Sequence, residues 1–454
     1  MTSSIATARA NRPRIRRALV ASFAAERRGL LAGLAGRFIA PGQGNDPIRS
    51  PEALPTGRNF HALDGGQLPT RTAYELGVSL ADRTPPASTE GEAESVILWA
   101  SDTVRDEGTM IAFGLHRLGI RPVWSPRGVL QGLAREDASR RRDIVWVTSG
   151  LFRDLYPNLL VWLDRAALLA LDASSRTVEE ARPDLRAALS AALAPLGALR
   201  SPGDEPLASN YVARHWVEAA DAALARGVAP EVAGREASLR VFGNAPGGYS
   251  AGINRLAERS GAFRDRAELA RVFVSRMGHA YGIDRHGEPV HDAFRGALER
   301  TGRAYFGRAS HLYGLLDNND GFDYLGGLSL AIEHARGSTP ESFVIRHADA
   351  RDAEIESLAS GLTRELRGRH LNPHALRALM EHGYAGARTM STGFVENLWG
   401  WQLTNPEVVE PWIWDEVHAV FVEDKHGLGL DRFLDEGANV HVKTNILAIL
   451  LVAA

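Results

Sequence analysis

The sequence predicts an α/β protein: a lobe with a parallel sheet, followed by a larger and mainly helical region. Residues 95–100 and 143–150 are short, almost entirely apolar runs, which is typical of buried strands. Between them, residues 102–119 predict a helix, with Asp102 as its N-cap and Ile111 and Leu115 on one face. Strand–helix–strand order with short connections indicates a parallel sheet with crossover helices.

Other elements follow in chain order. The first helix is expected to end near Gly36, with an apolar side formed by Leu19, Phe23, Leu30, Leu31 and Leu34. Four prolines and three glycines exclude a helix from residues 40–59. A second helix is expected from about residue 70, because Thr72 and Glu75 have the spacing of a capping box. Residues 120–125 predict a further strand between the two buried ones.

Beyond the lobe, residues 239–258 predict a strand, a glycine-rich turn and a helix, and helices dominate from residue 264 onward. We therefore divide the chain into four segments: an N-terminal helix with an irregular stretch (1–56), the α/β lobe (57–172), a mixed helical region with two polar loops (173–330) and a mainly helical C-terminal region (331–454).

Composition excludes several classes of function. The 454 residues contain no cysteine, which rules out disulfides, zinc ribbons, iron–sulfur clusters and thiolate catalysis. A net charge of −3 argues against general nucleic-acid binding. No apolar run approaches the roughly 20 residues of a membrane-spanning helix, and no secretory signal is present, so we expect a cytoplasmic protein. The arginine-rich N-terminus fits either the first helix of the body or a transit peptide.

The first polar loop is glycine-rich and contains Asn244, Gly247, Gly248 and Tyr249 between a strand and a helix. Such a turn can hold an anion with backbone N–H groups. Because the loop matches neither the P-loop nor the dinucleotide fingerprint, we expect no nucleotide site in this chain. The pattern leaves two interpretations open, a tight structural turn and a ligand-facing loop.

The second polar loop is rich in aspartate and contains Asp317, Asp320 and Asp323, with His311 just before it. Carboxylates crowded in this way must be solvated, cap a helix or meet a cation. The spacing is not that of an EF-hand, so a helix-capping turn and a metal-facing cleft both stay open. His347 follows a short predicted strand, where a lone histidine is usually structural.

Several long segments occur in an order that resembles a known family. They include "IAPGQGNDPIRSPEALPTGRNFHALD", "RVFGNAPGGYSAGIN", "LLDNNDGFDYLGGLSLA", "LNPHALRALMEHGYAGARTMSTGFVENLWGWQLTNP" and "PWIWDEVHAVFVEDKHGLGLDRFLDE". Together they resemble the large subunit of cobaltochelatase, the CobN type, and the porphyrin-binding H subunit of magnesium chelatase. The resemblance extends from about Arg37 to Ala454.

The resemblance implies ATP-dependent insertion of a divalent metal into a tetrapyrrole. Cobalt is the expected metal substrate, with hydrogenobyrinic acid a,c-diamide as its acceptor in cobalamin biosynthesis, and magnesium is the alternative. Separate AAA+ ATPase subunits of the family hydrolyse ATP, which agrees with the lack of a P-loop here. A magnesium or nickel chelatase component and a non-catalytic tetrapyrrole carrier or sensor are the competing interpretations.

Family members are typically more than twice as long, and this chain resembles their C-terminal portion. A fragment with a missing N-terminal half, a split subunit and a degenerate copy are all compatible with that length. For the chemistry, the incoming metal needs oxygen or imidazole ligands, and two pyrrole protons need a carboxylate or histidine base.

The candidate residues follow from those requirements. We expect the catalytic residues to be Asp317, Asp320, Asp323 and His311, with Asp320 and His311 receiving the metal. Arg58 would pair with a side chain of the macrocycle. The other expected substrate-binding residues are Asn244, Gly247, Gly248, Tyr249 and His347. We also expect the two polar loops to line one cleft.

Overall fold

The computed structural model describes residues 2–43, 47, 51–61, 64–258, 262–310 and 313–453. The chain forms two compact units, each assembled from three separate segments. Unit 1 comprises Met1–Tyr249, Gly278–Leu312 and Ile345–Ile355; unit 2 comprises Ser250–Met277, Tyr313–Val344 and Glu356–Ala454. Because both units are discontinuous in sequence, the four consecutive segments proposed above stay a prediction.

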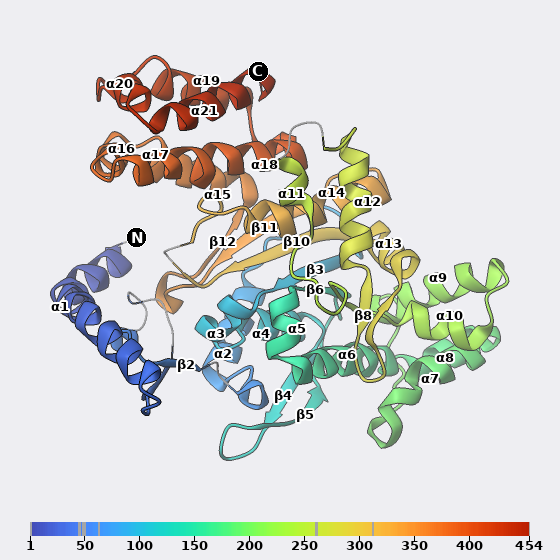
Figure 1. Cartoon of the computed structure of the whole chain (residues 1–454). Helices are drawn as coiled ribbons and strands as arrows, with labels where there is room; N and C mark the ends of the chain where they lie inside the picture. The colour runs from blue at the N-terminus through green and yellow to red at the C-terminus, as the bar shows by residue number, and fades with distance from the viewer. Residues whose placement is uncertain are drawn as a thin grey trace. The chain divides into compact units, whose positions relative to one another are not determined.

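An eight-stranded sheet with the order β12-β11-β10-β3-β6-β7-β8-β9 forms the centre of unit 1 (Figure 1). Its strands are β3 (Ala93–Leu98), β6 (Ile144–Thr148), β7 (Val241–Gly243), β8 (His279–Tyr281), β9 (His286–Pro289), β10 (Thr301–Arg308), β11 (Glu341–Arg346) and β12 (Glu354–Ser357); the unit boundaries fall within the last two. β10, β3, β6 and β7 pair in parallel, whereas β8 and β9 form an antiparallel edge. The predicted α/β fold with a parallel sheet is confirmed.

The centre of the sheet follows directly from the sequence. Every residue of β3 and β6 is buried, and parallel strands covered on both faces are continuous apolar runs for that reason. Along the chain, β6 and β7 are added on one side of β3, and β10 is then added on its other side. In open α/β sheets this reversal of direction opens a crevice at the carboxyl ends of the strands, where ligands usually bind.

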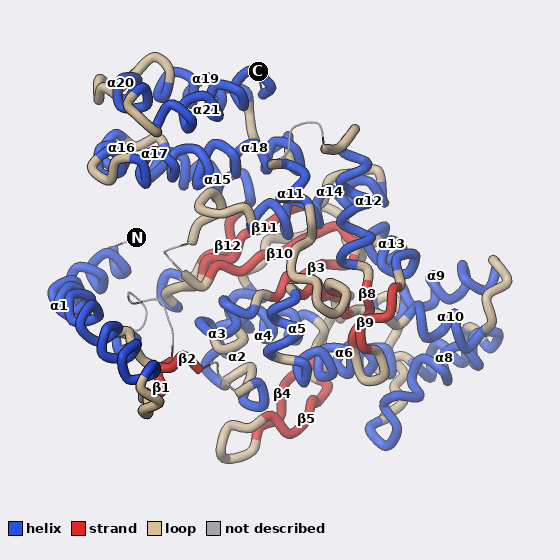
Figure 2. The backbone as a smooth tube through the Cα atoms, viewed as in Figure 1, coloured by secondary structure: helices blue, strands red, loops and turns tan. Residues whose placement is uncertain are grey.

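The described helices of unit 1 include those that cover its sheet (Figure 2). They are α1 (Thr2–Leu34), α2 (Arg71–Asp82), α3 (Ala100–Asp106), α4 (Thr109–Arg117), α5 (Gly150–Leu155), α6 (Pro157–Asp172), α7 (Ser175–Ala181), α8 (Arg186–Leu193), α9 (Tyr211–Ala225), α10 (Pro230–Ala237) and α13 (His291–Glu299). Within this set, α7 to α10 lie side by side as one helical group (Figure 1). Short parallel strands β1 (Pro41–Gln43) and β2 (Asn59–His61) follow α1.

The predicted strand at residues 120–125 forms, but its predicted place in the parallel sheet is wrong. β4 (Ile120–Trp124) pairs antiparallel with β5 (Leu130–Arg135) in a separate two-stranded sheet. Pro122 gives the reason, because proline lacks the N–H that a central strand must donate. Arg121 is exposed, which also suits a hairpin more than a buried strand.

The predicted helix at residues 102–119 is two helices, α3 and α4. They are separated by Glu107 and Gly108, whose φ angles are 59° and 90°. The Asp106 carboxylate accepts hydrogen bonds from the backbone N–H groups of Gly108 and Thr109 at 2.7 and 3.2 Å, so it caps α4. The predicted N-cap Asp102 is therefore wrong, since it lies within the first turn of α3.

The helix predicted near residue 70 also forms, but its cap is a different threonine. Thr70 is the N-cap of α2, and its hydroxyl accepts a hydrogen bond from the Ala73 N–H at 3.3 Å. Thr72 lies inside the helix. Thr70 and Thr72 have the same side-chain chemistry and lie two residues apart, so the sequence alone does not distinguish which of them caps the helix.

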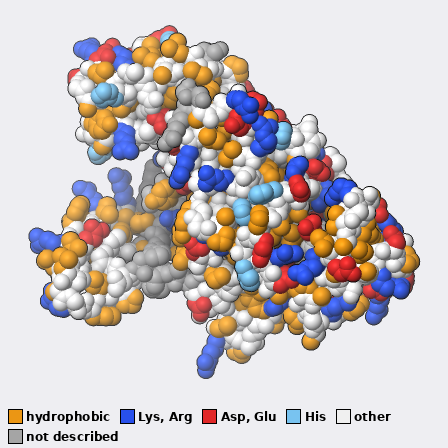
Figure 3. Space-filling model, turned by 45° about the vertical axis from the view of Figure 1, so that its right-hand side comes forward, with side chains coloured by type: hydrophobic (Ala, Val, Ile, Leu, Met, Phe, Trp, Pro, Cys, Tyr) orange, Lys and Arg blue, Asp and Glu red, His pale blue; other side chains and the backbone are white. Residues whose placement is uncertain are grey.

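The first helix ends at Leu34, as predicted, yet its apolar side chains are not covered. Leu19, Phe23 and Leu34 are 54%, 77% and 77% exposed. Among the described residues, no helix combines the length and hydropathy that crossing a bilayer requires. Basic and acidic side chains are interspersed over the face seen in Figure 3, in agreement with the small net charge.

Unit 2 is helical, apart from its parts of β11 and β12. Its helices are α11 (Ile253–Ala257), α12 (Arg266–Met277), α14 (Gly327–Arg336), α15 (Leu358–Glu365), α16 (Pro373–Met380), α17 (Tyr384–Met390), α18 (Glu396–Thr404), α19 (Pro411–Phe421), α20 (Leu430–Asp435) and α21 (Asn439–Ala453). Its core is aromatic: Phe322, Phe394 and Trp401 are at most 1% exposed. Gly400 is required there, because a Cβ at that position would lie 2.4 Å from the Phe322 ring.

Candidate functional site

Buried polar side chains gather where the strands of unit 1 end. Arg308 is the last residue of β10, His347 follows β11, and Asp102 and Asp106 lie on the helix that follows β3. All four residues are at most 7% exposed. β3 and β10 are neighbours at the reversal point of the sheet, so these side chains occupy the crevice position of an α/β fold.

Hydrogen bonds fix the orientation of His347 in this cluster. Its Nε2 lies 2.7 Å from the Asp106 carboxylate and its Nδ1 lies 2.9 Å from the Ile345 carbonyl oxygen. Burial alone would lower the pKa of His347, but the hydrogen bond and charge of Asp106 outweigh burial and raise it above the ordinary histidine value. Asp106 thus favours the protonated form of His347.

Two members of the cluster have polar atoms that are buried without a hydrogen-bond partner among the described residues: Arg308 at Nε and Nη2, and Asp102 at Oδ2. Burial raises the pKa of Asp102, although the charges of Arg308 and His347 act in the opposite direction. Each unmade hydrogen bond in a buried place costs free energy, so this strand-end cluster has unused capacity to bind a polar group.

The glycine-rich loop also lies at a strand end, directly after β7. Arg153 on α5 holds it, because its Nη1 donates to the carbonyl oxygens of Asn244, Ala245 and Gly248 at 3.2, 2.7 and 3.3 Å. The Asn244 carbonyl also accepts a hydrogen bond from the Tyr281 hydroxyl. One arginine thereby binds three carbonyl groups of the loop and links it to α5.

Two glycines of this region are required by geometry. Gly247 has a φ of 82°, in the left-handed region that side chains disfavour. Gly150, at the start of α5, packs so closely on the loop that a Cβ there would lie 2.0 Å from the Gly248 carbonyl oxygen. Tyr249 is 58% exposed, and its hydroxyl donates to Asp154 at 2.7 Å. The loop is therefore rigid and presents an aromatic ring to solvent.

The aspartate-rich turn lies in unit 2. Asp317 accepts a bidentate pair of hydrogen bonds from Arg369, both at 2.7 Å, and its side chain is 15% exposed. His370 lies 3.9 Å from the same carboxylate and stacks on Phe394. Burial lowers the pKa of His370 to about 4, so it is neutral at physiological pH, and its Nε2 has no hydrogen-bond partner in the described part of the chain.

Asp323 is buried and points at the start of α11. Its oxygens accept hydrogen bonds from the Ser250 hydroxyl and from three backbone N–H groups, those of Ala251, Ile253 and Asn254, at 2.8–3.1 Å. Burial raises its pKa to about 6 despite these donors. Asp323 thus caps a helix, which is one of the two interpretations left open above; its catalytic role stays a prediction.

A pocket of about 780 Å³ opens beside the turn, within the size range of small-molecule sites. It is lined by Glu258, Asp317, Asn318, Asn319, Tyr384, Ala385, Arg388, Thr389, Thr392, Gly393, Glu396 and Asn397, all in unit 2. Glu396 accepts hydrogen bonds from Ser391 and Asn445, and burial raises the pKa of its carboxyl group. The pocket combines three carboxylates, those of Glu258, Asp317 and Glu396, with the guanidinium of Arg388.

Three π-helical turns of unit 2 contain residues of the aspartate-rich turn, its partners or the pocket lining. Phe322–Gly326 contains Asp323, Leu366–His370 contains Arg369 and His370, and Ser391–Val395 lines the pocket. π-Helical turns are rare in proteins and are frequent at functional sites. No local pattern in the sequence predicts three π-helical turns near the aspartate-rich turn.

The remaining predicted residues are placed as follows. Arg58 is exposed in unit 1, with its Nε 3.3 Å from the Pro55 carbonyl oxygen. Asp320 is half-buried and accepts a hydrogen bond from Asn318 at 3.2 Å. His311 lies outside the described residues. Within the described ranges, no group of three or more metal-binding side chains occurs, and the shared cleft of the two loops stays a prediction.

Sequence reasoning missed several residues around the turn. Arg369 and His370 contact Asp317, and Glu365 accepts a hydrogen bond from the Leu316 N–H at 3.3 Å, while being only 6% exposed itself. Glu396 was also overlooked. The sequence contains only a partial sign of these contacts. The segment "RGRHLNP" has a histidine between two arginines and a helix start, but its spacing does not link that histidine to Asp317.

The chain is similar in sequence to subunits of two kinds of metal chelatase. The H subunit of the magnesium chelatase of Cereibacter sphaeroides is 34% identical over 404 residues, covering 87% of this chain and 30% of that protein. The aerobic cobaltochelatase subunit CobN of Pseudomonas aeruginosa is 32% identical over 377 residues, covering 80% of this chain and 28% of that protein. The chain therefore spans about a third of the length of these relatives.

A solved structure gives the same result at the level of the fold. The catalytic subunit of cobaltochelatase from Mycobacterium tuberculosis matches with a TM-score of 0.80 and 29% identity, over 96% of this chain and 34% of that one. The family model described as CobN/Magnesium Chelatase matches residues 3–454. Since this match covers nearly the whole sequence, the chain belongs to the CobN/Magnesium Chelatase family.

Proposed function

We propose that the chain forms the tetrapyrrole-binding C-terminal part of the large subunit of an ATP-dependent metal chelatase, which inserts cobalt into hydrogenobyrinic acid a,c-diamide. Family membership supports the chelatase class. The observation that carries the site is the pocket beside the aspartate-rich turn, because it combines a volume of about 780 Å³ with carboxylates, amides and an arginine.

The chemistry of metal insertion suits that pocket. A divalent metal substrate must exchange water for protein oxygens, and Asp317, Asn318 and Asn319 supply them at the pocket wall. Two pyrrole protons must leave, and a carboxylate with a raised pKa accepts a proton near neutral pH. We assign that role to Glu396. Arg388 would pair with a carboxylate or amide side chain of the macrocycle.

The catalytic and metal-receiving roles of Asp320 and His311 remain part of this proposal. The strand-end cluster and the glycine-rich loop of unit 1 would bind the periphery of the substrate, with Asn244, Gly247, Gly248, Tyr249 and His347 as contacts. Arg58 would pair with a propionate or acetamide group. AAA+ ATPase subunits would hydrolyse ATP and drive closure, and the assembly would work in the cytoplasm.

Magnesium insertion into a porphyrin is the second candidate. The specific observation in its favour is the 34% identity to the H subunit of a magnesium chelatase, beside 32% to a CobN subunit. The two candidates share the pocket and differ in metal and macrocycle. A non-catalytic tetrapyrrole carrier shares the pocket as well, but would show no turnover.

A reconstituted insertion assay tests the assignment of Glu396. In the complete assembly with ATPase subunits, Glu396→Gln should lower kcat by about 100-fold or more, the usual contribution of general acid–base catalysis, while KM stays close to wild type. Glu423→Gln, which changes an exposed glutamate outside the pocket, is the matched control. Equal kcat values for the two variants would remove Glu396 from the mechanism.

A further inference from the structure

A separate pocket of about 360 Å³ lies in unit 1, between the helical group and α13. Four arginines line it: Arg226, Arg240, Arg295 and Arg300. We call it the arginine pocket. Its other walls are formed by alanines of α9, α10 and α13, together with three carboxylates, those of Glu236, Asp292 and Glu299. None of its residues takes part in the sites described above.

Arg240 forms the floor of the arginine pocket and is 2% exposed. Its Nε donates to Asp143 at 2.6 Å, and its Nη1 donates to the carbonyl oxygens of Ala237 and Leu239 at 2.9 and 2.8 Å. The Nη2 is buried and has no hydrogen-bond partner among the described residues. The buried Nη2 group of Arg240 therefore lacks a hydrogen-bond acceptor among the described residues, and a bound ligand could provide one.

Asp143 does not accept a hydrogen bond from Arg240 Nη2, because its two carboxylate oxygens already interact with Arg240 Nε and with His215. The second oxygen of Asp143 lies 2.8 Å from His215 Nδ1. Burial would raise the pKa of Asp143, but Arg240 and His215 outweigh burial and lower it well below the ordinary value. The Asp143 carboxylate therefore interacts with Arg240 and His215, and neither of its oxygens is left for Arg240 Nη2.

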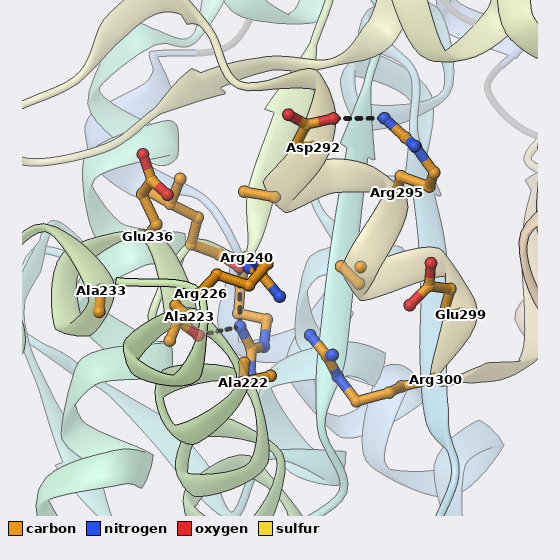
Figure 4. A pocket seen from close by; sticks show the side chains of 16 residues that line it. Ala222, Ala223, Arg226, Ala233, Glu236, Arg240, Asp292, Arg295, Glu299 and Arg300 are labelled. Carbon is orange, nitrogen blue, oxygen red and sulfur yellow. Dashed lines mark hydrogen bonds and ion pairs between the residues drawn. The ribbon is translucent and has the colours of Figure 1, made fainter. Parts of the chain in front are cut away.

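Arg226 and Arg300 extend toward the same space as Arg240 (Figure 4). In the described part of the chain, neither guanidinium forms a hydrogen bond or an ion pair. Burial and the charge of Arg240 lower the pKa of Arg300, while the carboxylates of Asp143, Glu218 and Glu299 act in the opposite direction. By contrast, Arg295 pairs with Asp292 at the rim (Figure 4).

Three converging guanidinium groups favour an anion with several oxygens. A carboxylate offers two oxygens and one charge, whereas a phosphate group offers three or four oxygens and carries a charge of about −1.5 to −2 at neutral pH. The volume of about 360 Å³ exceeds that of a phosphate ion, and the alanine walls suit a small organic body. Such a volume lies at the lower end of the range for ligand sites.

We propose that the arginine pocket binds the phosphate group of a small phosphate ester, with Arg240, Arg226 and Arg300 as its ligands. The site is independent of metal insertion, because it uses none of the residues of the chelatase pocket. Inorganic phosphate would provide the same oxygens without the organic body, so comparing the free ion with an ester distinguishes the two sources.

Calorimetric titration of the full chain tests this site. Inorganic phosphate and glycerol phosphate are titrated in parallel, with malonate as the carboxylate probe. We expect saturable binding of glycerol phosphate, weaker binding of inorganic phosphate and the weakest binding of malonate. Arg300→Gln should weaken glycerol phosphate binding by about tenfold or more, the loss expected for a hydrogen bond to a charged group. Arg295→Gln, at the rim, should change it by less than about twofold.

The possible outcomes separate a binding role from a structural one. If Arg300 only stabilises the end of α13, Arg300→Gln will lower the melting temperature in phosphate-free buffer and leave the titration unchanged, which overturns the proposal. Should Arg300→Gln fail to fold, Arg226→Gln provides the same test from the residue that follows α9. No heat from either phosphate probe with the wild-type chain, or tighter binding of malonate, also overturns it.

Discussion

Asp320 and Asp323 lie three residues apart in one turn and illustrate how differently two aspartates can be used. Asp323 is 1% exposed and serves four donors at the start of α11, whereas Asp320 is half-buried near Asn318. A carboxylate that satisfies buried backbone N–H groups stabilises the fold, because its removal leaves those groups unpaired. The half-buried Asp320 instead accepts a hydrogen bond from Asn318, which lines the pocket of unit 2.

The two aspartates therefore predict opposite results on alanine substitution. Asp323→Ala should lower the free energy of unfolding by about 3 kcal/mol or more, because several buried donors lose their acceptor. Asp320→Ala should change it by less than about 1 kcal/mol and weaken metal insertion in the complete assembly. Urea unfolding and insertion kinetics measure both effects. Unfolding of the Asp320 variant would assign that residue to the fold instead of the chemistry.

His347 predicts a pH dependence of stability. Its pKa in the folded chain is raised by Asp106, so the folded state binds the proton more tightly than the unfolded state does. The stabilisation is fully present below the unfolded histidine pKa of about 6.5 and is lost as the pH rises through the folded value. Urea unfolding between pH 6 and 9 should show this loss.

Two histidine variants isolate the contribution of that pair. His347→Gln should abolish this part of the pH dependence, because the remaining glutamine does not titrate. His382→Gln, at an exposed position of unit 2, should keep the wild-type profile. A pH profile that is identical in wild type and His347→Gln would contradict a charged His347–Asp106 pair.

For the contacts of the candidate site, the sequence indicated one of the two interacting residues and missed the other. Asp317 was found because it stands in a crowded acidic turn, but Arg369, which binds it, is 52 residues further along the chain. Glu396 carries no motif at all; only its burial beside the pocket identifies it. Contacts between residues distant in sequence depend on tertiary packing, which a pattern of neighbours does not encode.

Among the elements, the glycine-rich loop was predicted well because glycine and strand signals are local. The strand, the turn and the following helix all lie where the sequence indicated them. The strand at residues 120–124 was placed in the wrong sheet for the opposite reason. Strand character is local, whereas the choice of partner strand depends on the whole chain, and Pro122 was the one local sign of an edge position.

Two glycine substitutions test how the loop is held. Gly150→Ala places a Cβ against the Gly248 carbonyl oxygen and should cost about 1–3 kcal/mol, as overpacking does. Gly247→Ala meets no atom within 4 Å, and its strained φ should cost only about 1 kcal/mol. Chymotrypsin cleavage after Tyr249 should accelerate strongly in the first variant alone. Equal rates in both would show that α5 does not hold the loop.

For the whole molecule, the sequence predicted the α/β class and the family, but it did not predict the order in which the strands pair in the sheet. Its central strand β3 pairs with β6, about 50 residues later, and with β10, about 200 residues later. Each compact unit likewise combines three separate segments. Such long-range pairing explains why polar loops from distant parts of the chain needed a structure before their surroundings could be described.

The central claim is that this chain binds a tetrapyrrole, and a binding titration tests it most directly. The purified chain is titrated with metal-free hydrogenobyrinic acid a,c-diamide and, in parallel, with a metal-free porphyrin, and binding is followed by the absorbance of the macrocycle. We expect saturable one-to-one binding of the corrinoid, weaker binding of the porphyrin, and loss of affinity in Arg388→Gln, which changes the pocket arginine. Preference for the porphyrin would favour the magnesium alternative. Failure of the wild-type chain to bind either macrocycle would contradict the account.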